Sequence, residues 1–292
     1  MSWLQLKLDT ERNAVEALED ALLAAGAVSV TLQDLEDNPI LEPGVGETPL
    51  WDNIRLMGLF TADTDTALAT VQATAHYGAD LPVHRWEILE DKDWERTWMD
   101  NYQPIQCGQR LWICPSWLQP PKADAVNLML DPGLAFGTGT HPTTFLCLKW
   151  LDGLDLAGKT VVDYGCGSGI LGIAALLLGA DKVIAIDNDP QALLATADNG
   201  QRNGIDPARL TTYLPGEQPQ LQADIVVANI LAAPLIELAE TISGHTRSGG
   251  LLCMAGLIDS QQQEVMAAYV NQFDFHPSEN QDEWLRLSAT KR

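Results

Sequence analysis

Within residues 163–187, three glycines at alternate positions and an aspartate at each end stand in an order that is typical of a nucleotide-binding turn. Asp163 lies at the end of a short apolar run, and Gly165, Gly167 and Gly169 follow at alternate positions. Glycines there let the backbone bend sharply and approach a ligand closely, which side chains would prevent. Asp187 ends the next apolar run, 18 residues after Gly169. The pattern predicts a strand, a glycine-rich turn, an apolar helix, and a second strand that ends in an acid.

The acid before the glycines indicates S-adenosylmethionine (SAM) rather than a nicotinamide dinucleotide. The same segment matches the dinucleotide pattern GxGxxG at Gly167, Gly169 and Gly172, but that pattern alone is a weak signal. A dinucleotide places its pyrophosphate on the helix N-terminus, whereas SAM has no phosphate and carries an α-ammonium and a carboxylate. Asp163 can hold the ammonium directly or through water, and a dehydrogenase has no need of a carboxylate there. We therefore expect Asp163, Gly165 and Gly167 to bind SAM in a methyltransferase.

Asp187 occupies the position at which the acid of a dinucleotide site accepts hydrogen bonds from both ribose hydroxyls. We expect it to hold the ribose of SAM, with capping of the following helix as the alternative. Asp189 is the better candidate for that cap, because Pro190 directly after it suits the first position of a helix.

Asn229 ends the apolar run 225–228 and should lie at the carboxyl edge of the sheet, where ligands bind in open α/β folds. Its amide can accept a hydrogen bond from a substrate amine and donate one to the cofactor. Methyltransferases that act on bases or glutamine often carry Asn/Asp-Pro-Pro-aromatic here, whereas this chain has Asn229-Ile230-Leu231-Ala232. The missing aromatic residue argues against a nucleobase and is compatible with an aliphatic amine.

The segment 131–144, DPGLAFGTGTHPTT, is rich in glycine and could order over the cofactor as a lid. Pro142 can start the next helix, which leaves Thr144 in the first turn with a hydroxyl for a ligand. Phe136 offers a face for adenine or for the sulfonium cation. We expect His141 to have a capping or structural role rather than to act as a base. The alternative for the whole segment is an ordinary glycine-rich connection.

The chain is strongly acidic, with 17 basic and 40 acidic residues and a net charge of -23. Residues 1–90 hold 16 acids and 4 bases, so this part is more than twice as negative per residue as the rest. We expect no direct binding of nucleic acid, because such binding depends on neutralising phosphates. A cationic partner is favoured, because the field raises its local concentration. The alternative is that the acidity only keeps the chain soluble.

Other global features indicate a cytoplasmic protein. No apolar run approaches the length of a membrane span, and the N-terminus lacks the pattern of a secretory signal. The five cysteines are odd in number and form no CxxC, which is typical of reduced thiols. Nothing in the sequence demands more than a monomer.

The alternation of hydrophobic periods predicts a ferredoxin-like α+β domain over residues 1–90, in the order βαββαβ. We expect this domain to recognise the substrate, with a purely structural role as the alternative. Residues 91–103 predict a linker helix, with Trp94 and Trp98 one turn apart on one face. The domains could reorient about this helix, or both tryptophans could simply pack in a core between the domains.

Residues 104–292 alternate strands and helices, as expected of an α/β domain with a doubly wound sheet. The short runs 111–117 and 125–131 could pair with each other before the main sheet begins. One helix is expected over 233–244. The chain should close with a pair of strands over 274–280 and 283–289, a sheet ending that is typical of SAM-dependent methyltransferases.

Four segments together resemble the ribosomal protein L11 methyltransferase family (PrmA): DPGLAFGTGTHPTT, VVDYGCGSGILGIAALLLGA, VIAIDNDPQAL and ADIVVANILAAPL. The loop FGTGTHPTT is the specific part, because the glycine motif alone occurs across SAM-dependent enzymes. The resemblance covers essentially the whole chain. It implies a Rossmann-like, seven-stranded class I SAM methyltransferase domain preceded by a ferredoxin-like α+β domain.

The resemblance also implies the reaction and the residues that serve it. The reaction would be SAM-dependent trimethylation of lysine side chains and of the N-terminal α-amine of ribosomal protein L11, a basic partner. By motif, Thr144, Gly165, Asp187 and Asn229 would contact SAM, and Phe136 would lie beside it. We expect Asn229 to orient the lone pair of the acceptor amine. No strong base is evident in these motifs, so the amine would lose its proton to solvent.

Two other functions remain open on the sequence alone. The chain could methylate a small molecule or another basic protein, in which case turnover would not need residues 1–90. It could also be a scaffold that binds SAM or a nicotinamide without catalysis.

Overall fold

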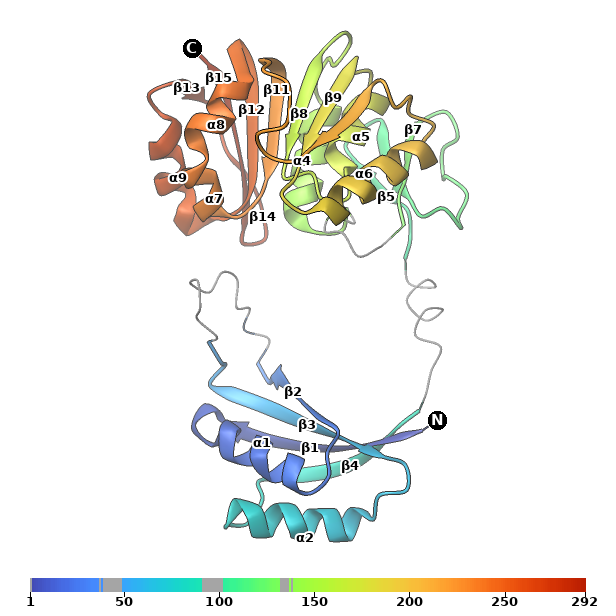
Figure 1. The fold of residues 1–292 in the computed structure, drawn as a ribbon, viewed down its shortest axis with the longest axis vertical. Helices are drawn as coiled ribbons and strands as arrows, with labels where there is room; N and C mark the ends of the chain where they lie inside the picture. The colour runs from blue at the N-terminus through green and yellow to red at the C-terminus, as the bar shows by residue number, and fades with distance from the viewer. Residues whose placement is uncertain (1, 37, 39–48, 91–101, 132–136, 138) are drawn as a thin grey trace. The chain divides into compact units, whose positions relative to one another are not determined.

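The computed structural model describes the chain except for residues 1, 37, 39–48, 91–101, 132–136 and 138. The chain divides into two compact units, Met1–Met99 and Asp100–Arg292, each with its own sheet (Figure 1). The predicted linker helix, with Trp94 and Trp98, falls almost wholly on residues 91–101 and so lies outside the described residues.

Unit 1 has the βαββαβ order that the sequence predicts. Its elements are β1 (Trp3–Glu11), a 3₁₀ turn (Arg12–Ala14), α1 (Val15–Ala24), β2 (Ser29–Asp34), β3 (Asn53–Thr61), α2 (Thr66–Tyr77) and β4 (His84–Leu89). The strands form an antiparallel sheet in the order β2-β3-β1-β4. This is the ferredoxin-like arrangement.

One face of the unit 1 sheet is covered by both helices (Figure 1). Alternate residues of β1 and β3, such as Leu6 and Leu56, are fully buried and pack with Leu18 and Leu22 of α1. Because side chains alternate between the faces of a strand, the residues between them lie on the opposite face, which no helix of the described part of unit 1 covers.

Unit 2 begins with a small sheet of three strands among the described residues: β5 (Ile105–Cys107), β6 (Leu111–Cys114) and β7 (Val126–Met129). The predicted pairing of the runs 111–117 and 125–131 is confirmed, because β6 and β7 pair in parallel. The helix α4 (Pro142–Asp152) follows and leads into the main sheet.

The main sheet of unit 2 alternates strands and helices along the chain. The elements are β8 (Thr160–Tyr164), α5 (Ile170–Leu177), β9 (Lys182–Ile186), α6 (Pro190–Arg202), β10 (Leu210–Tyr213), β11 (Ala223–Asn229), α7 (Ala232–Glu237), α8 (Ala239–His245), β12 (Thr246–Ile258), α9 (Gln262–Tyr269), β13 (Phe273–Phe275), β14 (Glu279–Gln281) and β15 (Trp284–Lys291). A 3₁₀ turn (Asp259–Gln261) precedes α9.

Seven of the described strands form one path, in the order β10-β9-β8-β11-β12-β15-β13, and β14 pairs with β15 as an eighth. Strands β8 to β12 are parallel, whereas β15 is antiparallel to its neighbours. The mostly parallel sheet and its antiparallel ending are therefore confirmed. The described sheet has one strand more than the predicted seven, because the expected strand 274–280 forms two short strands, β13 and β14. The carboxyl ends of β8, β9 and β11 meet at one edge, where the sequence predicts the ligand site.

Two separate apolar cores cover the two faces of this sheet. Side chains from α4, α5 and the small sheet form the first core, and those from α7, α8 and α9 form the second. Along β11, Val227 belongs to the first core and Ala228 to the second, so Asn229 faces the α4 side.

One element differs from the sequence prediction. The segment 233–244 forms two short helices, α7 and α8, that meet at Leu238 instead of one helix. Leu238 leaves the helical conformation at φ -95° and ψ 12°. Leu235 of α7 and Ile242 of α8 are both fully buried in the second core. The packing of each short helix against this core therefore outweighs the sequence periodicity that favours one continuous helix.

None of the helices formed by the described residues has the length and apolarity that spanning a bilayer requires. The five cysteines are buried free thiols.

Candidate functional site

The glycine-rich turn joins β8 to α5 as predicted. Gly165, Gly167 and Gly169 have φ values of +77°, +54° and +77°, a conformation that side chains disfavour. A Cβ at Gly165 would overlap the Cγ2 methyl of Ile230, the residue after Asn229. The turn is therefore closely packed against the end of β11, and glycine is required there both by conformation and by space.

Asp163 lies beneath this turn and is almost completely buried, at 1% exposure. Its Oδ2 accepts a hydrogen bond of 2.9 Å from the N–H of Gly172 in α5. Burial raises the pKa of Asp163 to about 7; the bond from Gly172 acts in the opposite direction, and the charge of Asp187 adds to the rise. Among the described residues, none donates a hydrogen bond to the buried Oδ1 of Asp163.

Asp187 follows β9 and faces the turn from the neighbouring strand. Its Oδ2 accepts from the N–H of Gly167 at 2.9 Å, and its Oδ1 accepts from the N–H of Asp189 at 3.0 Å. Asp189 is the N-cap of α6 and accepts from the N–H of Gln191, with Pro190 at the first helical position. The predicted cap at Asp189 is thus confirmed, and Asp187 does not cap the helix. Each carboxylate oxygen of Asp187 retains a lone pair for a further donor.

Thr144 and Asn229, which are 85 residues apart, come together at the carboxyl edge of the sheet. Thr144 lies in the first turn of α4 and is fully buried. The Nδ2 of Asn229 donates to its Oγ1 at 3.2 Å. The Oδ1 of Asn229 is also buried, and no described residue donates to it. The Nδ2 atom therefore fixes the amide of Asn229, while Oδ1 stays available to accept a hydrogen bond from a ligand.

Of the predicted loop over the cofactor, Phe136 lies outside the described residues, so its expected place beside SAM stays a prediction. Gly137 is described, and its carbonyl oxygen accepts a hydrogen bond of 2.7 Å from the hydroxyl of Ser168 in the glycine turn. The carbonyl oxygen of Ser168 accepts in turn from Asn199 of α6 at 2.9 Å. Ser168 is not among the residues predicted from the sequence, although its place between two glycines of the turn was a usable signal.

His141 is the N-cap of α4, which confirms the predicted capping role. Pro142 is the first residue of that helix, as expected. The imidazole packs edge-on against Trp284, with the ring centroids 4.7 Å apart and the planes at 67°. No local pattern predicts this contact of Trp284, because only the pairing of β15 with β12 in the folded chain brings Trp284 to this edge.

These residues fit a bound SAM molecule. The buried Oδ1 of Asp163 suits a cation such as the α-ammonium, and the lone pairs of Asp187 suit the ribose hydroxyls. The glycines of the turn have no side chains, so a ligand can lie directly against their backbone. Hydrogen bonds join four of the predicted cofactor residues in two pairs, Gly167 with Asp187 and Asn229 with Thr144. Gly165 packs against Ile230, the residue after Asn229. The free acceptor atoms of Asp163, Asp187 and Asn229 would suit a cation, a ribose and an amine.

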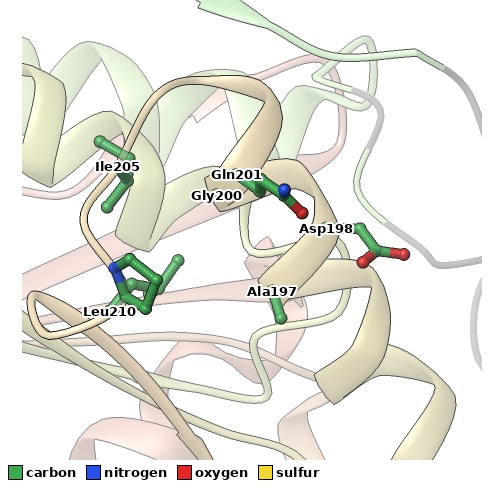
Figure 2. A pocket seen from close by; sticks show the side chains of 7 residues that line it. Ala197, Asp198, Gly200, Gln201, Ile205 and Leu210 are labelled. Atoms are coloured by element: carbon green, nitrogen blue, oxygen red, sulfur yellow. The ribbon is translucent and has the colours of Figure 1, made fainter.

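A separate pocket of about 460 Å³ lies on α6 and β10 (Figure 2). None of the predicted site residues lines it. It includes Leu210, the first residue of β10, and so lies at the amino edge of the parallel strands, opposite the site. Its lining consists of Ala197, Asp198, Gly200, Gln201, Ile205, Pro207 and Leu210.

Comparisons with known proteins agree with this geometry. The family model "Ribosomal protein L11 methyltransferase (PrmA)" matches residues 2–292. A protein of that name from Cellvibrio japonicus is 60% identical over 291 residues, which cover 100% of this chain and 99% of that protein. Another from Pseudomonas aeruginosa is 56% identical over 292 residues, with the same coverage. The crystal structure of a ribosomal protein L11 methylase from Lactobacillus delbrueckii subsp. bulgaricus is 31% identical, with a TM-score of 0.59, and covers 65% of this chain and 100% of that one.

Proposed function

This chain belongs to the ribosomal protein L11 methyltransferase family (PrmA), and we propose that it trimethylates lysine side chains and the N-terminal α-amine of that ribosomal protein. The chain is a SAM-dependent methyltransferase, and L11 is its substrate. The observation that carries the proposal is the hydrogen bond between Thr144 and Asn229 beside the glycine turn. This hydrogen bond fixes the amide of Asn229 at the edge of the sheet where ligands bind, so that its Oδ1 would meet an aliphatic amine there.

Six described residues would hold the cofactor. Asp163 would bind the α-ammonium and Asp187 the ribose hydroxyls, while Gly165 and Gly167 would offer backbone at close approach. Thr144 and Asn229 would contact the cofactor at the end of β11. When bound, SAM supplies a methyl group on a sulfonium, which is already activated for displacement. The work of the protein is therefore mostly to orient the reacting groups. Phe136 would lie beside the cofactor.

Asn229 would orient the acceptor amine. Its Oδ1 can accept a hydrogen bond from an amine N–H, which directs the amine lone pair away from the amide. The amine must be neutral, and bringing a lysine from a pKa of ~10.4 to neutrality at pH 7 costs about 4.6 kcal/mol. An α-amine with a pKa of ~8 costs about 1.4 kcal/mol. Burial near a cation would lower both pKa values, so the proton can leave to solvent without a dedicated base.

Unit 1 would dock the basic substrate. On the sheet face away from its helices, three of the four basic residues among 1–90, Lys7, Arg55 and Arg85, form ion pairs with Glu87 and Asp9 at 2.6 Å. Other acids of unit 1 have no such partner among these bases, and Glu16, Glu19 and Asp20 of α1 are among them. Such a surface attracts a cationic protein and repels nucleic acid. The enzyme would act as a monomer in the cytoplasm, without direct contact to nucleic acid.

The proposal is tested with the full-length chain, radiolabelled SAM and three acceptors: unmethylated L11, an unrelated basic protein and free lysine. We expect label only on L11. Equal labelling of the other basic protein or of free lysine would favour a broader methyltransferase. Binding of SAM without any transfer would favour a scaffold, and either result would overturn the proposal.

A further inference from the structure

His141 stands where the loop before α4 enters that helix, and its Nδ1 makes two contacts with one residue. The N–H of Thr143 donates to Nδ1 at 3.3 Å, and the hydroxyl oxygen of Thr143 lies 2.7 Å from the same atom. A backbone N–H can only donate, so Nδ1 must be the acceptor. The hydroxyl then donates as well, and the ring proton of the neutral imidazole belongs on Nε2.

The orientation of this ring is set by a second element. Trp284, the first residue of β15, packs against the imidazole with ring centroids 4.7 Å apart. Burial lowers the pKa of His141, while the charge of Glu283 acts in the opposite direction. Burial thus favours the unprotonated Nδ1 that the contacts with Thr143 require.

The residue after Thr143 is the one that holds Asn229. Thr144 is fully buried, and its hydroxyl oxygen lies 3.2 Å from the Nδ2 of Asn229, near the upper end of the usual range for a hydrogen bond. A small shift of the first turn of α4 would therefore break this bond. The cap at His141 fixes that turn.

We propose that His141 is a positioning residue for the methyl-transfer site, acting through the first turn of α4 on Thr144 and Asn229. Histidine is not among the preferred N-cap residues, which are Ser, Thr, Asp and Asn. Here it supplies an acceptor for the helix and a flat ring for Trp284, which none of those residues supplies. The inference rests on the proposed function, because it assigns Thr144 and Asn229 to the site.

The test compares His141→Ala with His141→Asn. The Oδ1 of asparagine occupies the same place along the side chain as Nδ1 and is a good N-cap acceptor. Affinity for SAM is measured by calorimetry, and kcat with L11 as acceptor, at about pH 8 where histidine is neutral. Asp65→Ala is the matched control, because Asp65 caps α2 in unit 1 by accepting from Ala67 and Leu68.

We expect His141→Ala to weaken SAM binding by about tenfold, the equivalent of one hydrogen bond, and to lower kcat as well. His141→Asn should return both values to within about threefold of wild type. Asp65→Ala should lower the thermal midpoint to a similar extent and leave SAM affinity unchanged. Wild-type affinity in His141→Ala, or no recovery in His141→Asn, would overturn the positioning role. If the wild type itself bound no SAM, the proposed function would be at fault instead.

A second measurement needs no substitution and applies even if His141→Ala fails to fold. The ¹⁵N chemical shifts of the His141 ring in the wild-type protein report which nitrogen carries the proton. We expect an unprotonated Nδ1 whose shift changes when SAM binds. A proton on Nδ1, or a shift indifferent to SAM, would contradict the inference.

Discussion

Asn229 and Asp163 share one arrangement: each side chain has one atom fixed by the protein and a second, buried atom without a donor among the described residues. The fixed atom limits the rotation of the side chain, so the other atom keeps a constant direction. A binding site gains from such preorganisation, because less freedom is lost when the ligand arrives. The same arrangement makes the partner that fixes each side chain as important as the side chain itself.

Thr144→Val tests this dependence at Asn229. Valine has nearly the shape of threonine but cannot accept a hydrogen bond, so the Nδ2 of Asn229 loses its partner. We expect kcat/KM for SAM to fall by about tenfold, which corresponds to ~1.4 kcal/mol. Thr144→Ser keeps the hydroxyl and should retain most of the activity. Equal activity in the two variants would show that the hydroxyl of Thr144 plays no part.

Asp163 predicts how stability depends on pH. Its pKa is about 7 in the folded chain and 3.8 as the reference, so the folded state binds more protons between these values. The contribution of Asp163 to the free energy of unfolding is fully present below about pH 4 and is lost as pH rises through about 7. The free energy of unfolding falls by no more than about 1.4 kcal/mol per pH unit from this cause. Asp163→Asn cannot titrate. In urea unfolding at several pH values, the free energy of unfolding of this variant should decline less steeply with pH than that of the wild type. Equal slopes for the two proteins would show that Asp163 is not the group that titrates.

The same carboxyl predicts how SAM binding depends on pH. An ammonium beside Asp163 favours the charged form, so SAM should bind more tightly as pH rises from about 5.5 to about 7 and should displace a proton. Calorimetry in two buffers of different ionisation enthalpy measures the displaced proton. In Asp163→Asn we expect weaker binding and a smaller dependence on pH. A variant that keeps the wild-type dependence would show that another group is responsible.

At the scale of elements, the end of β11 is held between two glycines. Ile230 packs over Gly165 on one side, and its backbone lies against Gly256 of β12 on the other. Gly256 has a φ of +86° and falls within the irregular register between Met254 and Leu257. Both glycines are thus needed to keep Asn229 at its place at the carboxyl edge.

Gly256→Ala should therefore damage the fold and the site together. A Cβ there would collide with the backbone of Ile230, which cannot move aside as a side chain can, and the positive φ adds strain. We expect a loss of roughly 2–4 kcal/mol in the free energy of unfolding and weaker SAM binding. Gly244→Ala in α8 is the matched control, because no atom lies within 4 Å of the added methyl group. Similar stability of the two variants would contradict this account.

The sequence predicted the parts of the site that depend on short spacing. The glycine turn and Asp187 follow from the order of residues in one βαβ unit, and the cap at Asp189 follows from the proline after it. Asn229 follows from its place at the end of an apolar run, and Thr144 from its place after Pro142. Their contact joins elements 85 residues apart, so no local pattern predicted it. The role of Gly256 depends on the register of β12 against β15. No local pattern contains that information.

At the scale of the whole molecule, acidity is concentrated where we propose that substrate docks. Residues 1–90 carry a net charge of -12, and the open sheet face of unit 1 is nearly balanced by its ion pairs. The exposed acids Glu16 and Asp20 lie one turn apart on α1. We propose that both acids belong to the surface that meets the basic substrate.

Reversing both charges, Glu16→Lys with Asp20→Lys, should raise KM for L11 several-fold at low salt while SAM affinity stays unchanged. The difference from wild type should shrink as salt screens the charges. The matched control is Glu237→Lys with Glu240→Lys, which makes the same change at exposed positions of unit 2. If the control raised KM equally, docking would depend on net charge rather than on unit 1.

The most direct test of the central claim is intact mass spectrometry of unmethylated L11 after incubation with SAM and the full-length chain, wild type or Asn229→Ala. The account predicts that the wild type adds mass in steps of one methyl group until each modified amine carries three. It predicts that Asn229→Ala adds methyl groups far more slowly. Wild-type protein that binds SAM yet leaves the mass of L11 unchanged would contradict the account, as would Asn229→Ala at the wild-type rate.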